Sequence, residues 1–194
     1  MNTEFINETL NDLIQNLNQF KKTKFQSNLI EVAKVINKNL NSRNIIFSCG
    51  NGGSASQASH FTTELIVRFK KKYERKPHAS VCLGSDMSMF TAIGNDYGFE
   101  FIFSRELEGL GKKNDCVIFF STSGNSKNLI KAADKAKSLG IKTISITGNN
   151  GGKLKKKTHM NINIDSNDTA RIQECHLYII HLLIELIEIE NNND

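Results

Sequence analysis

Several features are scarce in this sequence, and each absence excludes a class of protein. One proline in 194 residues excludes a proline-rich linker or a polyproline scaffold. No apolar stretch approaches the roughly 20 residues that a membrane-spanning helix needs. Residues 1–5 carry neither the basic nor the apolar segment of a signal peptide. We therefore expect a cytoplasmic protein with no membrane partner.

Cysteine is also sparse. The four cysteines, Cys49, Cys82, Cys116 and Cys175, are far apart and form no CxxC pair. Their spacing fits neither a zinc finger nor a disulfide framework. All four lie in or beside apolar runs, so we expect four small, buried, free thiols.

Length and charge set further bounds. A chain of 194 residues suffices for one domain with a buried core and is short for two. Its 39% hydrophobic and 23% charged residues exclude wholesale disorder. A net charge of +5 and a pI near 9.0 raise the question of a nucleic-acid partner. Basic runs are usually solvated, and the two here, 70–72 and 153–157, fall at an expected helix end and an expected loop. We therefore expect no nucleic-acid partner.

The first forty residues have a helical pattern. Residues 3–41 contain neither glycine nor proline, and apolar residues recur about every 3.6 positions. This spacing predicts one or two amphipathic helices with a break near 21–24. We assign 1–194 to a single domain, with 1–41 as a helical N-terminal extension.

From residue 43 to 190 the pattern changes to strands alternating with helices. Short apolar strands are predicted at 44–49, 79–83, 116–120, 143–147 and 160–164. Helical spacing follows at 54–69, 126–139 and 169–190. This alternation predicts an α/β core, a central parallel sheet flanked by helices. Ligands of such sheets bind at the carboxyl ends of the strands.

The first strand ends in a glycine-rich turn, residues 50–55. It fits a loose G-x-G-x-x-A dinucleotide fingerprint, which requires an acidic residue about 20 residues later. The acidic residue after the next strand, Asp86, lies 36 positions beyond Gly50, so we expect no nucleotide. The turn is either a tight bend that needs positive φ, or a loop whose backbone N–H groups face a polar ligand beside Asn51 and Ser54.

A second turn, residues 121–126, follows another apolar strand and opens a helix. It carries four hydroxyl side chains and one glycine in six residues. Free backbone N–H groups and the helix dipole favour an anion at such a position, most simply a phosphate. The loop contains no lysine, so it is not a P-loop. One capping residue, Asn125 or Ser126, would suffice for an ordinary helix start, and the surplus hydroxyls favour phosphate.

Two helices carry candidate acid–base groups. His60 and Glu64 are four residues apart, so they point within about 40° of each other. Gln173, His176 and His181 form a polar set within an otherwise apolar helix. Each histidine is either a satisfied core residue or a functional one. The set allows a zinc site or metal-free proton transfer. The spacing lacks an H-x-x-x-H pair and glutamine is an uncommon zinc ligand, so the spacing alone supports zinc only weakly.

These segments together resemble one known family. The motifs CGNGGSASQASHFTTEL, GNDYGFEFIFSRELE, STSGNSKNLIKAA, ITGNNGGKL and ARIQECHLYIIHLLIELIE occur in order between residues 43 and 188. In sequence and separation they resemble the sedoheptulose 7-phosphate isomerases of the sugar isomerase (SIS) domain family. The resemblance implies a flavodoxin-like SIS fold and a homotetramer with active sites between subunits.

The resemblance also implies a reaction, an aldose–ketose isomerisation. It would convert the phosphorylated seven-carbon sugar D-sedoheptulose 7-phosphate to D-glycero-D-manno-heptose 7-phosphate through an enediol. The product would supply surface heptose for lipopolysaccharide, capsule or S-layer glycan.

Site residues follow by position. The resemblance makes Glu64 the base and His181 its acid/base partner, and it implies one zinc ion per subunit. The implied zinc ligands are His60, Glu64, Gln173 and His181. The implied phosphate ligands are Ser121, Thr122, Ser123 and Ser126. The implied further substrate contacts are Asn51, Gly52, Gly53, Glu64, Asn95, Asp96 and Gln173.

Two alternatives stay open beside this interpretation. One is a non-catalytic SIS tetramer that binds the bacterial replication initiator, and the other is an isomerase of a different sugar phosphate. The joint presence of the four implied zinc ligands favours an enzyme, because a protein that only binds has no need for all of them.

Overall fold

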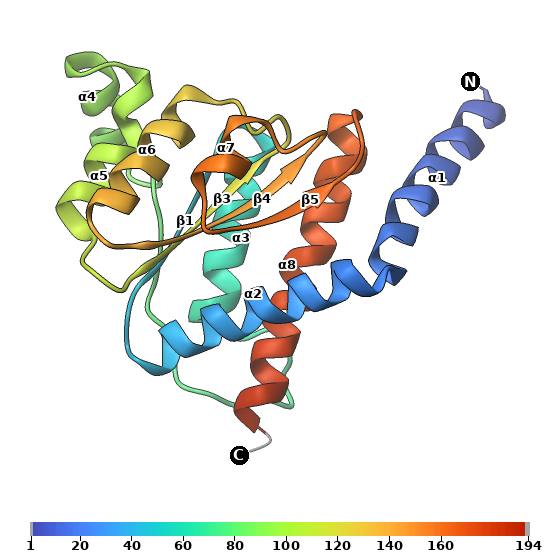
Figure 1. Cartoon of the computed structure of the whole chain (residues 1–194), viewed down its shortest axis with the longest axis horizontal. Helices are drawn as coiled ribbons and strands as arrows, with labels where there is room; N and C mark the ends of the chain where they lie inside the picture. Colours follow the sequence, from blue (N-terminus) through green and yellow to red (C-terminus); the bar gives the residue numbers. More distant parts are fainter. Residues whose placement is uncertain (1, 193–194) are drawn as a thin grey trace.

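The computed structural model describes residues 2–192, which form a parallel five-stranded sheet between two layers of helices (Figure 1). The strand order is β2-β1-β3-β4-β5. The strands span Ser80–Cys82 (β2), Ile46–Gly50 (β1), Cys116–Ser121 (β3), Lys142–Gly148 (β4) and Met160–Ile164 (β5). All five predicted strands are present, and the predicted α/β class is confirmed.

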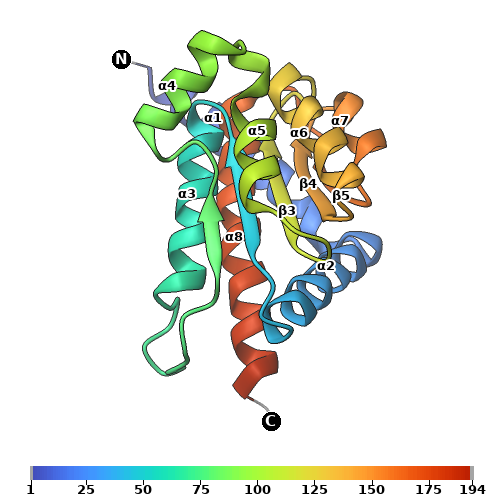
Figure 2. The ribbon, with the colours of Figure 1, turned by 90° about the vertical axis from the view of Figure 1, so that its left-hand side faces the viewer.

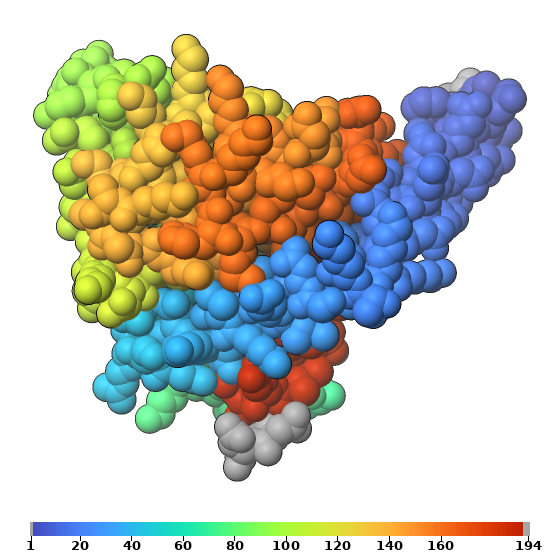
Figure 3. All heavy atoms as spheres, in the orientation of Figure 1, coloured from blue at the N-terminus to red at the C-terminus, as the bar shows by residue number. Residues whose placement is uncertain are grey.

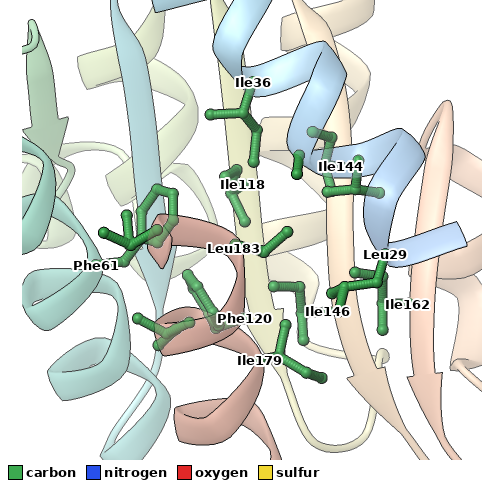
Figure 4. Close-up of a cluster of buried hydrophobic side chains, with 14 of the residues drawn as sticks. Leu29, Ile36, Phe61, Ile118, Phe120, Ile144, Ile146, Ile162, Ile179 and Leu183 are labelled. Atoms are coloured by element: carbon green, nitrogen blue, oxygen red, sulfur yellow. The ribbon is translucent and has the colours of Figure 1, made fainter. Parts of the chain in front are cut away.

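The central strands are buried on both faces, which explains their continuous apolar sequences. Successive side chains of β3 point to opposite faces of the sheet. Ile118 and Phe120 enter one hydrophobic cluster, and Val117 and Phe119 enter the other. Figure 4 shows the first cluster, in which side chains from both flanking helices and strands interdigitate.

The first cluster lies beneath α2 (Thr23–Asn41), α3 (Gly53–Ile66) and α8 (Thr169–Asn192). The second lies beneath α5 (Ile102–Leu110) and α6 (Lys127–Ser138). The predicted helices are therefore confirmed, although α3 ends three residues earlier than expected, before Lys70–Lys72.

The N-terminal extension is helical as predicted, in two segments. Helix α1 (Thr3–Leu17) passes through a short 3-10 turn, η1 (Asn18–Lys21), into α2, so the break falls slightly before the predicted position. α1 projects away from the body of the molecule (Figures 1 and 3). It carries large exposed apolar side chains, namely Phe5, Ile6, Leu10 and Ile14.

Some elements were not predicted. These are α4 (Met87–Asp96), the 3-10 turn η2 (Phe99–Phe101), α5 and α7 (Gly152–Lys157). The expectation of a loop at 153–157 was wrong. Leu154 is fully buried there, and its backbone N–H donates to the Gly124 carbonyl at 2.9 Å, so a lysine-rich segment still packs as a helix.

The expectation of four buried thiols was partly wrong. Cys49, Cys116 and Cys175 are buried, whereas Cys82 is half-buried because its strand forms an edge of the sheet. All four are free thiols. Among residues 2–192, no helix combines the length and the apolar character needed to cross a bilayer.

Helices α3 and α8 lie side by side and run parallel (Figure 2). Their contacts keep an almost constant register. Gln57 donates to the Gln173 carbonyl, His60 meets His181, and the chain just after α3 meets Glu188. This pairing places the polar residues of both helices along one shared seam.

Candidate active site

The glycine turn after β1 begins this seam. Gly52 has φ of +56°, which favours glycine, as the positive-φ interpretation predicted. A Cβ atom on Gly53 would lie 2.6 Å from the Gln173 Nε2, so the missing side chain lets α8 approach the turn. Gln57 adds a hydrogen bond of 2.6 Å from its Nε2 to the Gln173 carbonyl. The turn and Gln173 therefore form one unit.

Asn51 has a partner that the sequence did not reveal. Its Nδ2 donates to the Asn128 Oδ1 at 2.9 Å, and the Asn128 Nδ2 donates back at 2.8 Å. This reciprocal pair ties the glycine turn to the first turn of α6. Asn51, Ser126, Lys127 and Asn128 line one side of a cavity of about 750 Å³, and residues 97–101 line the other.

The hydroxyl loop between β3 and α6 is shaped by its own side chains. The Ser121 Oγ accepts from the Gly124 N–H at 3.0 Å, and the Ser123 Oγ accepts from the Asn125 N–H at 3.2 Å. Both hydroxyls keep a proton to donate. Ser126 occupies the N-cap position without making a side-chain cap bond, which leaves its hydroxyl available. This is the arrangement expected of an anion seat.

Helix α7 holds this loop from the other side. Gly124 has φ of +62°, and a Cβ atom there would overlap the Gly151 carbonyl. The Lys153 N–H donates to the Asn125 Oδ1 at 3.1 Å. Asn125 thus braces the loop against α7 and is not the helix cap.

The acid–base groups converge at the middle of the seam. The Nε2 atoms of His60 and His181 lie 3.0 Å apart, so one ring donates and the other accepts. The His60 Nε2 lies 3.7 Å from the Glu64 Oε1. Burial, and then the neighbouring His60, lower the pKa of His181, while Glu64 opposes the shift. Two imidazoles beside a carboxylate can exchange protons or bind a metal.

These donors suit zinc in their chemistry and pairwise spacing. Zinc–nitrogen bonds of about 2.0–2.1 Å in a tetrahedral site put adjacent ligand atoms roughly 3.3 Å apart. The observed separations of 3.0 and 3.7 Å bracket that value. Among residues 2–192, no group of three histidine, cysteine or acidic side chains is already arranged to hold a metal ion.

Other predicted site residues lie apart from this centre. Gln173 is eight residues before His181, about 12 Å of helix rise. Asn95 and Asp96 are exposed at the end of α4, where the Asn95 Nδ2 donates to the Asp96 Oδ1 at 2.8 Å. One chain thus gathers three of the implied zinc ligands, whereas Gln173, Asn95 and Asp96 lie away from them.

His176 is one of the residues whose role the spacing left open. Its side chain is fully buried, 6.5 Å between ring centroids from Phe120. Burial lowers its pKa to about 4, so the ring is neutral at pH 7. It therefore behaves as a core histidine.

Sequence reasoning missed three neighbours of the acid–base cluster. The Phe69 ring stacks on His181 at 5.1 Å between ring centroids. Arg75 and Glu188 form a buried ion pair at 3.3 Å. One signal was available, because Glu188 lies seven residues after His181 and so within about 20° of it on the same helix face.

Comparison with known proteins decides the family. The SIS domain model matches residues 10–148. A phosphoheptose isomerase from Helicobacter pylori (strain HPAG1) is 54% identical over 143 residues, which cover 74% of this chain and 73% of the relative. The chain belongs to the phosphoheptose isomerase family of SIS domain proteins.

Solved structures agree with this assignment to the phosphoheptose isomerase family. A phosphoheptose isomerase from Francisella tularensis superimposes with a TM-score of 0.91 at 31% identity, over 97% of this chain and 99% of that one. A phosphoheptose isomerase from Neisseria gonorrhoeae gives a TM-score of 0.88 at 34% identity, over 95% and 97%. The resemblance drawn from the motifs is confirmed, and the non-catalytic alternative is not favoured.

Proposed function

We propose that this chain converts D-sedoheptulose 7-phosphate to D-glycero-D-manno-heptose 7-phosphate. Its place among the phosphoheptose isomerases supports an aldose–ketose isomerase. The observation that carries the proposal is the convergence of Glu64, His60 and His181 on one seam, in a fold whose hydroxyl loop suits a phosphate.

The phosphate would bind at the N-terminus of α6. Donors there are the hydroxyls of Ser121, Thr122, Ser123 and Ser126 and the free N–H groups of the first helical turn. Lys127 adds a positive charge to the same cavity wall. Asn51, Gly52, Gly53, Asn95 and Asp96 stay predicted contacts for the sugar hydroxyls.

Isomerisation moves one proton between adjacent carbons. Glu64 would take the proton from C1 of the ketose while His181 supplies a proton to the C2 oxygen, giving the enediol. Return of a proton to C2, with loss of the proton on the C1 oxygen, yields the aldose. The carboxylate is mostly buried, with 17% of its side chain exposed, which limits competition from water.

We propose zinc as the resident metal, held by His60, Glu64 and His181. Gln173, the fourth implied ligand, lies about 12 Å of helix rise from His181 in the same chain. A bound zinc ion would polarise the sugar oxygens and stabilise the negative charge of an enediolate. Glu64 then has two competing roles, as base and as ligand.

We further propose a cytoplasmic homotetramer with active sites between subunits. The exposed apolar side of α1 supports assembly, because surfaces of this kind mark protein interfaces. The separation of Asn95, Asp96 and Gln173 from the acid–base cluster supports a site completed by another subunit.

The direct test is NMR of sedoheptulose 7-phosphate incubated with the purified protein, with and without added zinc. We expect aldose signals to appear, and Glu64→Gln to abolish them while the protein stays folded. An unchanged substrate under both conditions refutes the proposal. Parallel incubations with pentose and hexose phosphates test the other-sugar alternative, which faster turnover of either would favour.

A further inference from the structure

Beyond the acid–base cluster, the seam between α3 and α8 ends in a buried ionic network. Glu188 is fully buried in the second half of α8. Its Oε1 accepts from the Phe69 N–H at 2.9 Å and its Oε2 from the Lys70 N–H at 3.2 Å. The Arg75 Nε donates to the same carboxylate at 3.3 Å. One carboxylate thus organises the chain that follows α3.

Arg75 carries the network back to α3. Its side chain is 8% exposed. Its Nη2 donates to the Glu64 carbonyl at 2.6 Å, and its Nη1 donates to the Leu65 carbonyl at 2.7 Å. Carbonyls in the last turn of a helix lack partners within the helix. Arg75 therefore fixes the turn of α3 that presents the Glu64 carboxylate.

Glu188 reaches the other acid–base group through Phe69. The backbone bond to Glu188 fixes the start of the segment that carries the Phe69 ring. That ring stacks on the His181 imidazole with an interplanar angle of 29°. Arg75 thus holds the backbone of Glu64, and Glu188, through Phe69, holds the ring face of His181.

Stability alone is a weak reason for such a pair. Replacing a buried ion pair by well-packed apolar residues is often neutral or stabilising, because desolvation offsets the attraction between the charges. The hydrogen bonds of the network go to backbone groups beside the acid–base cluster. These contacts therefore fix the geometry of the backbone around that cluster.

We propose that Arg75 and Glu188 are positioning residues that set the relative placement of Glu64 and His181. The expected effect of these residues on kcat rests on the proposed isomerase function. Their structural effect, the placement of the His181 ring against Phe69, does not depend on turnover.

The test compares Glu188→Gln and Arg75→Lys with the matched control Glu108→Gln. Glu108 makes an exposed ion pair with Lys135 at 2.8 Å, so its variant has the same charge change away from the seam. We expect kcat for sedoheptulose 7-phosphate to fall about 10- to 100-fold in both seam variants. KM should change by less than about threefold, because the phosphate seat lies at α6. The control, Glu108→Gln, should have the same kcat and KM as the unmodified protein.

A double variant separates positioning from folding. Arg75→Met with Glu188→Leu replaces the ions by apolar groups of similar size. The Phe69 and Lys70 N–H groups lose their acceptor in this variant, so we expect lower thermal stability. At a temperature where the variant is still folded, we expect kcat to be reduced at least tenfold. Recovery of kcat together with stability would overturn the proposal and leave the pair a structural role only. If the double variant does not fold, the Arg75→Lys kinetics decide.

The imidazole NMR signals of His181 supply the readout that needs no turnover. Stacking on Phe69 shifts these resonances, so Glu188→Gln should move them and Glu108→Gln should not. Unchanged His181 resonances and unchanged kcat in Glu188→Gln refute the proposal. Moved resonances in a protein that turns over no sugar phosphate would leave the positioning role standing and refute the isomerase function instead.

Discussion

The side-chain amides of Asn51 and Asn128 donate to each other at 2.9 and 2.8 Å and join two loops that are 77 residues apart in sequence. Asn128 is buried and Asn51 is half-buried, so losing one partner leaves a buried or half-buried polar group without this bond. The pair fixes the distance between the glycine turn and the N-terminal end of α6.

We therefore predict strong coupling between these two residues. Asn51→Ala and Asn128→Ala should each lower the free energy of unfolding by about 1–3 kcal/mol. The double variant should lose less than the sum, with a coupling energy of about 1 kcal/mol or more. Urea unfolding of the four proteins measures the coupling, and strictly additive losses would contradict it.

This pair also shows what sequence reasoning could reach. Both loops were predicted, because each follows a continuous apolar strand and carries distinctive turn residues. The amide pair was not predicted, because an asparagine in a local sequence indicates a turn or a helix cap. Its partner lies in another βα unit. The same limit applies to Phe69 and Arg75. Helical spacing was predicted through Phe69, but both residues lie in the irregular segment after α3, and their partners lie on other elements.

The helices near residues 87–110 were missed for another reason. α4 and α5 are short, at 10 and 9 residues, and Gly94 and Gly109 weaken their local propensity. Packing of residues such as Phe103 and Leu107 against the sheet compensates. The resemblance to the family implies Asn95 and Asp96 as site residues there, while periodicity did not reveal the elements that carry them.

Gly124 should tolerate no side chain. Its φ is +62°, and a Cβ atom would overlap the Gly151 carbonyl, so Gly124→Ala forces the hydroxyl loop away from α7. We expect a loss of about 2 kcal/mol or more in unfolding free energy and weakened binding of phosphate. Gly109→Ala is the control, because nothing lies within 4 Å of a Cβ there and alanine favours the helix. Thermal unfolding with and without phosphate gives both quantities, and equal behaviour of the two variants would refute the prediction.

The apolar side of α1 should govern assembly. Ile6 and Leu10 are 62% and 51% exposed in the single chain, on a helix that projects from the body. Ile6→Glu with Leu10→Glu should shift the protein from the proposed tetramer to smaller species, because two charges would enter an apolar interface. Asn11→Glu, at an exposed polar position of the same helix, should keep the tetramer. Light scattering after size exclusion measures the mass, and a tetramer that survives the double change excludes this face as the interface.

The buried His176 should make stability depend on pH. Its pKa is about 4 in the folded chain, because burial disfavours the charged ring, and about 6.5 when unfolded. As the pH falls below 6.5 the unfolded chain takes up the proton first, so stability is complete above that value and declines toward pH 4. By linkage, this residue changes the free energy of unfolding by at most about 1.4 kcal/mol per pH unit.

His176→Asn isolates this contribution. The variant is less stable at every pH because it leaves part of a core site unfilled, and that offset should stay constant above pH 7. Between pH 6.5 and 4.5 its stability should fall less steeply than that of the unmodified protein, so the two curves approach each other. Carboxylate protonation acts on both proteins alike and cancels in the difference. Parallel curves in urea unfolding across this range would contradict a lowered pKa of His176 in the folded chain.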